Sequence, residues 1–136
     1  MTSDIKDDPP ETSGKFQTEV CPEYNIIRIT LLEVATPEDV NQFRAGPLMA
    51  SGCSRIVWDF KQDDLTAISA DDIRRFTEYV PEVPEGNRLA FVVPNELGFG
   101  IGRMLTTRME LSGNKARVSP FYTMDEALAW LISPQD

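Results

Sequence analysis

The segment Arg88–Met104, RLAFVVPNELGFGIGRM, decides the fold class of this chain. It opens with an apolar run of strand length, which suits a β-strand covered on both faces. Asn95 and Glu96 then supply an N-cap and an acidic first turn, so a helix is expected to begin at once. That helix should run to about Leu111 and end before Gly113. A strand leading directly into a helix is one unit of an α/β domain.

Apolar and β-branched segments on both sides of this unit predict four more strands. Ser54–Phe60 has the composition of a second central strand. Phe16–Val20 alternates apolar and polar residues, and turn residues at Pro22–Asn25 join it to Ile26–Leu32, which implies an antiparallel hairpin. Ala116–Phe121 is a weaker fifth strand.

Three further helices are predicted from their N-terminal signals, a Ser or Thr followed three positions later by an acid. Thr36 precedes a proline, which is favoured at the first helical position. Ser69 and Thr123 begin the other two, and Thr123 forms a full capping box with Glu126. The Gly46–Pro47 pair is expected to break the first of these helices, because proline removes an N–H and clashes with the preceding turn.

The resulting order, β-β-α-β-α-β-α-β-α, predicts a single α/β domain over residues 15–136. Its sheet should be mixed, with about five strands, because a hairpin feeds parallel strands joined by right-handed crossovers. About four helices should cover at least one face of that sheet, and we expect them to cover both. Residues 1–14 are polar and include two adjacent prolines, so we predict a disordered tail.

The amino-acid composition excludes several catalytic mechanisms and several classes of binding partner. None of the 136 residues is histidine, which excludes Ser-His-Asp and Cys-His catalysis and histidine metal sites. The net charge of −9 would repel nucleic acid and anionic membranes, so neither is an expected partner. Cys21 and Cys53 lack metal-ligand spacing, and we expect both to be reduced and buried. With no leader or long apolar run in view, a cytoplasmic protein is predicted.

An acidic stretch supplies one candidate site. Asp59 closes an apolar strand, at the end where α/β sheets usually place their sites. Paired carboxylates there could hold Mg²⁺ or accept a phosphoryl group, whereas the simpler interpretation is a solvated loop followed by acids that favour a helix N-terminus. The acids concerned are Asp59, Asp63, Asp64, Asp71 and Asp72.

The glycine-rich start of the helix in Arg88–Met104 supplies a second candidate. Gly98 and Gly102 fall on one helix face, where missing side chains permit close packing on the sheet or leave a groove for a ligand. The spacing fits neither a dinucleotide-binding fingerprint nor a P-loop. Arg103 is either a solvated helix residue or a cation for a negative head group.

Three stretches together carry a family resemblance: Arg55–Phe60, Arg88–Met104 and Phe121–Leu131. They resemble the SpoIIAA-like, STAS-related family of small bacterial proteins, over roughly residues 16–132. The resemblance implies a mixed sheet flanked by helices, similar to anti-sigma-factor antagonists and to CRAL-TRIO lipid-transfer domains. Most members of the family have no assigned biochemical function, so the resemblance informs the fold more than the mechanism.

Signalling members of that family carry a serine that a partner kinase phosphorylates at a helix start. Matching Ile68 to the apolar residue before their motif places Ser69 at the aspartate position and Ala70 at the phosphoserine position. The acceptor hydroxyl is therefore missing, and Asp71 and Asp72 would repel a phosphate.

We therefore expect a binding module without enzymatic activity and without a cofactor. It would contact a protein partner or a small apolar, lipid-like ligand near the N-termini of its second and third helices. The alternatives are an anti-sigma-factor antagonist switched by phosphorylation and an enzyme that uses Asp59 with a divalent ion. A homodimer stays open. The candidate binding residues are Gly98, Phe99, Gly100, Ile101, Arg103, Asp59 and Ser69.

Overall fold

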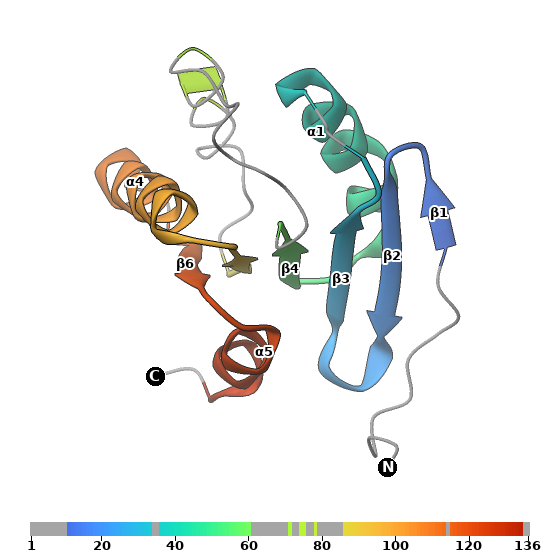
Figure 1. The fold of residues 1–136 in the computed structure, drawn as a ribbon. Helices are drawn as coiled ribbons and strands as arrows, with labels where there is room; N and C mark the ends of the chain where they lie inside the picture. Colours follow the sequence, from blue (N-terminus) through green and yellow to red (C-terminus); the bar gives the residue numbers. More distant parts are fainter. Residues whose placement is uncertain are drawn as a thin grey trace.

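The computed structural model describes residues 11–33, 36–60, 71, 74, 75, 78, 86–113 and 115–134. A six-stranded sheet crosses the molecule, with its strands side by side in chain order (Figure 1). β1, β2 and β3 are antiparallel, and β3 to β6 are parallel. The strands are β1 (Glu11–Ser13), β2 (Phe16–Cys21), β3 (Ile26–Leu31), β4 (Arg55–Asp59), β5 (Arg88–Val92) and β6 (Arg117–Phe121).

The mixed α/β sheet and its five predicted strands are confirmed. β1 is an additional strand that pairs with β2. It lies within residues 1–14, which were predicted to be a disordered tail. Three residues are too few to show a hydrophobic pattern in the sequence. The rest of that stretch, apart from Gly14, lies outside the described residues.

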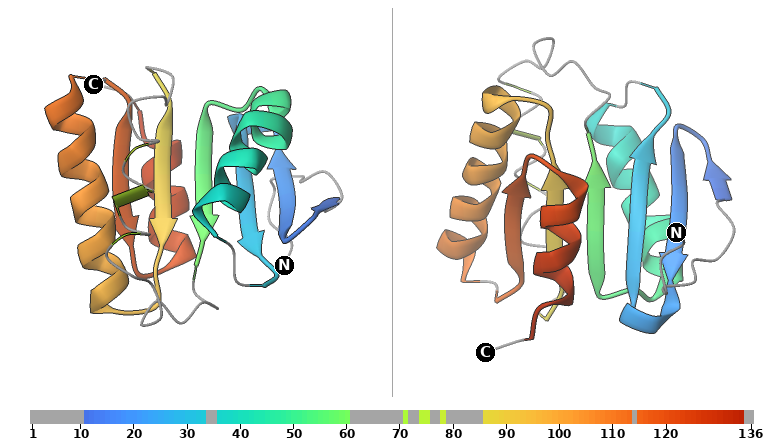
Figure 2. Two further views of the ribbon diagram at one scale, coloured as in Figure 1. Left: turned by 90° about the horizontal axis from the view of Figure 1, so that it is seen from above. Right: turned by 60° about the horizontal axis from the view of Figure 1, so that its bottom comes forward.

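Helices lie on both faces of the sheet, which gives three layers (Figure 2). One face carries a helical run between β3 and β4, made of α1 (Pro37–Phe43), the π-helix η2 (Arg44–Leu48) and α2 (Met49–Ser51). The same face carries α4 (Glu96–Ser112), and the opposite face carries α5 (Met124–Ile132). A short 3₁₀ turn, η1 (Pro22–Tyr24), links β2 to β3.

Three of the four predicted helices are thus present. The fourth, expected from Ser69, lies mainly outside the described residues, and Ser69 is itself outside them. The residues of that stretch that the structure describes are helical: Asp71, Arg74, Arg75 and Glu78. No helix in the described ranges is both long enough and apolar enough to cross a membrane.

Strand alternation divides the interior into two cores. In β5, Leu89 faces α1 and α4, whereas its neighbour Ala90 faces α5. The α1/α4 core consists of Phe16, Ile27, Ile29, Leu31, Phe43, Leu48, Cys53, Ile56, Trp58, Leu89, Leu105, Met109, Ala116 and Val118. The α5 core consists of Cys21, Ile26, Val57, Ala90, Val92, Ala127 and Leu131. Cys21 and Cys53 therefore lie on opposite faces, and neither forms a disulfide.

The predicted helix starts are confirmed where the structure describes them. Asn95 Oδ1 accepts the Gly98 N–H at 3.0 Å and caps α4. The reciprocal capping box forms at Thr36 with Asp39, where each side chain accepts the other residue's backbone N–H. At Thr123 the hydroxyl accepts a backbone N–H and itself donates to the carboxylate of the same acidic residue. The predicted reciprocal box is therefore one-sided there.

The prediction that Gly46–Pro47 breaks the first helix is wrong. The backbone remains helical from Pro37 to Ser51, and it widens into a π-turn around Pro47. A proline ring clashes with the carbonyl four residues earlier in an α-helix, and a wider turn moves that carbonyl out of its way. The run ends at Gly52, whose φ of 70° is the left-handed conformation that glycine adopts readily.

A charged pair fastens this helical run to the hairpin. Lys15 Nζ lies 2.8 Å from Asp39 Oδ2 at the first turn of α1. The hydrogen bond from Lys15, together with the one from the Thr36 backbone, lowers the pKa of Asp39 to about 2. The same pair raises the pKa of Lys15. Acid will therefore weaken this link between the β1–β2 turn and α1.

Arg88 closes the C-terminal end of α5 from inside the molecule. Its side chain is 2% exposed, and its Cζ lies 5.8 Å from the centre of the Trp130 ring. Nη1 donates to carbonyl oxygens of the last turn, at 2.8 Å to Trp130, 3.3 Å to Leu131 and 2.8 Å to Ser133. A cation at a helix C-terminus satisfies orphan carbonyls and complements the helix dipole, so this arginine anchors α5 to β5.

Candidate functional site

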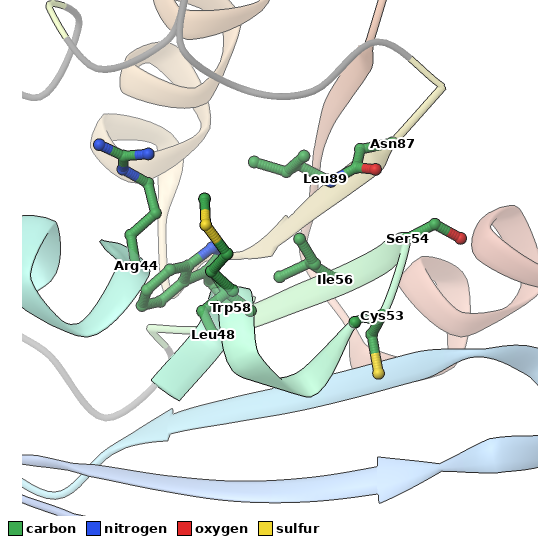
Figure 3. Close-up of a pocket in the computed structure, with 10 residues that line it drawn as sticks. Arg44, Leu48, Cys53, Ser54, Ile56, Trp58, Asn87 and Leu89 are labelled. Atoms are coloured by element: carbon green, nitrogen blue, oxygen red, sulfur yellow. The ribbon is translucent and has the colours of Figure 1, made fainter. Parts of the chain in front are cut away.

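A cavity of about 230 Å³ lies on the α1/α4 face of the sheet (Figure 3). Ile56 and Trp58 of β4 form part of its wall together with Leu89 of β5, and Leu48 and Met49 come from the helical run above. Its remaining lining residues are Arg44, Gly52, Cys53, Ser54 and Asn87. A cavity of roughly 150 Å³ with an apolar lining can already take up benzene, so this one can hold a larger apolar group.

The π-turn determines which helical residues reach the cavity. Arg44, Leu48 and Met49 line it and are spaced at i, i+4 and i+5. That spacing suits a turn with i→i+5 hydrogen bonds, which brings residues four and five apart onto one side. π-turns within helices are frequent at functional sites. The distortion that accommodates Pro47 therefore also shapes the cavity wall.

Aromatic rings extend this wall along the sheet. Trp58 packs edge-on against Phe16 and Phe43, with ring centroids 6.0 Å and 5.8 Å away. Phe60 stacks on Trp58 at 6.1 Å and on Phe91 at 6.0 Å. Such contacts hold the Trp58 ring in place beside the cavity. Phe60 and Phe91 are only partly buried and continue the apolar surface towards the carboxyl edge of the strands.

The predicted glycine site on α4 divides into a packed half and an open half. A Cβ at Gly102 would lie 2.5 Å from Pro120 Cβ, so this glycine lets α4 pack closely on β6. Gly98 is also buried, and its N–H is used by the helix cap. At Gly100 an added Cβ would meet nothing within 4 Å. Close packing thus explains Gly102, whereas a groove beside Gly100 stays a prediction.

The neighbouring side chains lie at the start of α4 without forming part of the cavity described above. Phe99 stacks on Tyr122, with ring centroids 4.8 Å apart and ring planes 10° apart. Ile101 is half-buried and Arg103 is exposed. These residues are close together because they belong to one helix.

Asp59 does not join that group. It is the last residue of β4, paired in register with Thr30 and Val92. Trp58 faces α1 and α4, so strand alternation directs Asp59 to the α5 face, the opposite side from α4. Asp59 and the start of α4 thus both lie at the carboxyl edge of the sheet, but on opposite faces.

The acidic candidate has limited structural support. Asp63, Asp64, Asp72 and Ser69 lie outside the described residues, while Asp71 forms an ion pair with Arg74 at 2.7 Å. Within the described ranges, no group of three Cys, Asp or Glu side chains comes together in a way that could hold a metal ion. The divalent-ion and phosphorylation hypotheses thus stay predictions from the sequence.

Sequence reasoning missed the residues that build the cavity. Arg44 precedes the Gly46–Pro47 pair that was expected to break the first helix, and Leu48 and Met49 follow it. No sequence signal marks a π-turn around a proline. Arg88 was assigned only to the start of a strand. A single charged residue opening an otherwise apolar strand was the one available signal for its buried role.

Comparisons with protein-family models, with curated proteins and with solved structures found no match to this chain. The similarity to the SpoIIAA-like family therefore stays an expectation from the sequence.

Proposed function

We propose that this protein is a binding module without enzymatic activity, which holds a small, mainly apolar ligand in the cavity beside Trp58. The observation that carries the proposal is the lining of that cavity. Five of its ten lining residues are large apolar side chains, namely Leu48, Met49, Ile56, Trp58 and Leu89. Ligand sites are typically concave, apolar and marked by a few polar groups. This cavity of about 230 Å³ is smaller than a typical site of about 300–1,000 Å³, so it suits only a small ligand.

The position of the cavity supports the same function. It lies between the helical run and the strands, so a ligand there would contact two layers at once. Trp58 is held by neighbouring rings and needs little ordering upon binding, which lowers the entropic cost of association. A rigid apolar wall of this kind favours binding of a compact alkyl or aryl group.

The test uses Trp58 as a built-in fluorophore. The only other tryptophan, Trp130, lies on the opposite face, so the Trp130→Phe protein reports on Trp58 alone. Titration with 1-octanol should give a saturable change in emission. Leu89→Phe should weaken that binding at least tenfold, because the larger ring occupies the cavity.

Gly100→Leu is the matched control, because it fills the open space beside α4 that the sequence predicted as a groove. It should leave octanol binding unchanged. The proposal fails if octanol produces no saturable signal. It also fails if Gly100→Leu abolishes binding while Leu89→Phe has no effect, since the ligand would then lie at the start of α4.

A further inference from the structure

Met49 belongs both to the wall of the cavity and to the surface of the protein. Its exposed fraction is 62%, whereas Leu48 beside it is 7% exposed and Trp58 is 4% exposed. Among the described residues that line the cavity, Met49 is the only large apolar side chain that is exposed. It therefore forms the part of the apolar wall at which the cavity meets the solvent.

Methionine is an apolar residue whose polarity an oxidant can change. A hydroperoxide transfers one oxygen atom to the sulfur: an S–O bond forms while the O–O bond breaks, and hydrogen peroxide leaves as water. The thioether is thereby oxidised to a polar sulfoxide, and the peroxide is reduced. The reaction needs access to the sulfur from solvent, and the exposure of Met49 provides it.

We propose that Met49 is a redox-sensitive modification site, and that its oxidation by a hydroperoxide weakens ligand binding in the cavity. This inference rests on the proposed function and adds regulation of the same site. An oxidised Met49 places a sulfoxide against an apolar ligand, which takes water from the new S–O group without offering it a hydrogen bond. Such burial of a polar group is unfavourable, so ligand affinity should fall about tenfold.

The other methionines provide the comparison that tests this assignment. Met104 on α4 is 52% exposed but is not among the lining residues of the cavity, so its oxidation should leave ligand binding unchanged. Met109 is 2% exposed and should react slowly. Exposure thus predicts which methionines are modified, and membership of the cavity wall predicts which modification affects the ligand.

The experiment treats the Trp130→Phe protein with hydrogen peroxide and then measures 1-octanol binding by Trp58 fluorescence. Peptide mass spectrometry locates the added oxygen, which should enter Met49 and Met104 faster than Met109. Octanol affinity should fall about tenfold as Met49 is modified. Methionine sulfoxide reductases should restore it, because they return the sulfoxide to the thioether.

Two substitutions separate Met49 from the other oxidisable groups. Met49→Leu keeps an apolar wall without a sulfur, so this variant should bind octanol before the treatment and keep its affinity afterwards. Met104→Leu is the matched control and should lose affinity after peroxide as its parent does. Both exchanges roughly conserve side-chain volume, so both variants should fold.

The outcomes separate this inference from the proposed function. If Met49→Leu also loses octanol binding after peroxide, another group such as Cys53 or Trp58 is responsible, and the inference is overturned. It is overturned as well if Met49 is oxidised while affinity stays the same, or if Met49 does not react. The proposed function stands in each of these cases, because the untreated protein binds octanol. If the untreated protein does not bind octanol, the proposed function fails and the inference fails with it.

Discussion

The two faces of the sheet are built from alternate residues of the same strands, yet they are filled to different degrees. On the α5 face, Val57, Ala90, Val92, Ala127 and Leu131 are all 0% exposed. On the α1/α4 face, the neighbouring side chains of Ile56, Trp58 and Leu89 border the cavity. Among the described residues, β4 and β5 therefore contribute fully buried side chains to the α5 core and border a cavity on the other face.

Residue size accounts for much of the difference. The α5 core includes Ala90 from the sheet and Ala127 from the helix, and such small side chains let a helix lie close to the strands. The α1/α4 face carries large rings and a helical run that is widened by its π-turn. Close packing stabilises the fold, and incomplete packing provides room for a ligand. The predictions that follow test this contrast, beginning with the largest expected effect.

Replacing Arg88 should have the largest effect on the sealed face. Arg88→Met removes the guanidinium that donates to the Leu131 and Ser133 carbonyls, of which the Leu131 bond is buried and the Ser133 bond is partly buried. Each buried acceptor left unsatisfied costs about 1–3 kcal/mol, so we expect about 3 kcal/mol to be lost from the free energy of unfolding. Urea denaturation measures this change. A loss below about 0.5 kcal/mol would show that Arg88 does not anchor α5.

Adjacent positions in β5 allow the two faces to be compared directly. Ala90→Leu forces extra carbons into the sealed face and should cost about 1–3 kcal/mol of unfolding free energy. Leu89→Phe places its extra atoms in the cavity, so its stability should stay within about 1 kcal/mol of wild type. Thermal and urea denaturation of the two variants provide the test. Equal destabilisation by both would mean that the faces are packed equally well.

Two glycines of α4 allow the same comparison of close and open packing, with smaller expected changes in stability. Gly102→Ala puts a methyl group against Pro120 and should destabilise the protein by about 1–2 kcal/mol, after the usual helix-propensity gain is subtracted. Gly100→Ala has open space and should gain up to about 1 kcal/mol. Opposite signs in urea denaturation are expected. A stabilised Gly102→Ala would contradict the close packing of α4 on β6.

The smallest effect concerns the link between Lys15 and Asp39. The pKa of Asp39 is about 2 in the folded protein, and it is about 4 in an unfolded chain. The stability that this carboxylate contributes is therefore present at neutral pH and is lost as pH falls from about 4 towards 2. Asp39→Asn should be less stable than wild type at pH 7, and the difference should shrink across that interval. A difference that did not depend on pH would contradict this assignment.

Much of the architecture could be predicted because its signals are local. Capping residues such as Asn95 and Thr36 mark helix starts within a few positions, and apolar runs mark the central strands. The cavity could not be predicted, because it depends on Arg44 and Leu48 being aligned by a turn around Pro47. Proline in a helical pattern usually signals a break, and only the packed structure shows that the helix continues.

The predicted site was likewise only partly predictable from the sequence. Sequence order placed Asp59 and Gly98 at one edge of the sheet, and that expectation follows from parallel topology. It could not place them on the same face, since a strand turns successive side chains to opposite sides. The charge of Arg88 was visible in the sequence, but its carbonyl partners come from α5, more than forty residues later.

The most direct test of the account places a cysteine on each face. Leu89→Cys lines the cavity, whereas Ala90→Cys lies in the sealed core. N-ethylmaleimide should modify Cys at position 89 at least tenfold faster than at position 90, as peptide mass spectrometry can measure alongside the native thiols. 1-Octanol should slow the reaction at position 89 alone. Equal rates at the two positions, or no protection by 1-octanol, would contradict the claim that this face holds a ligand site.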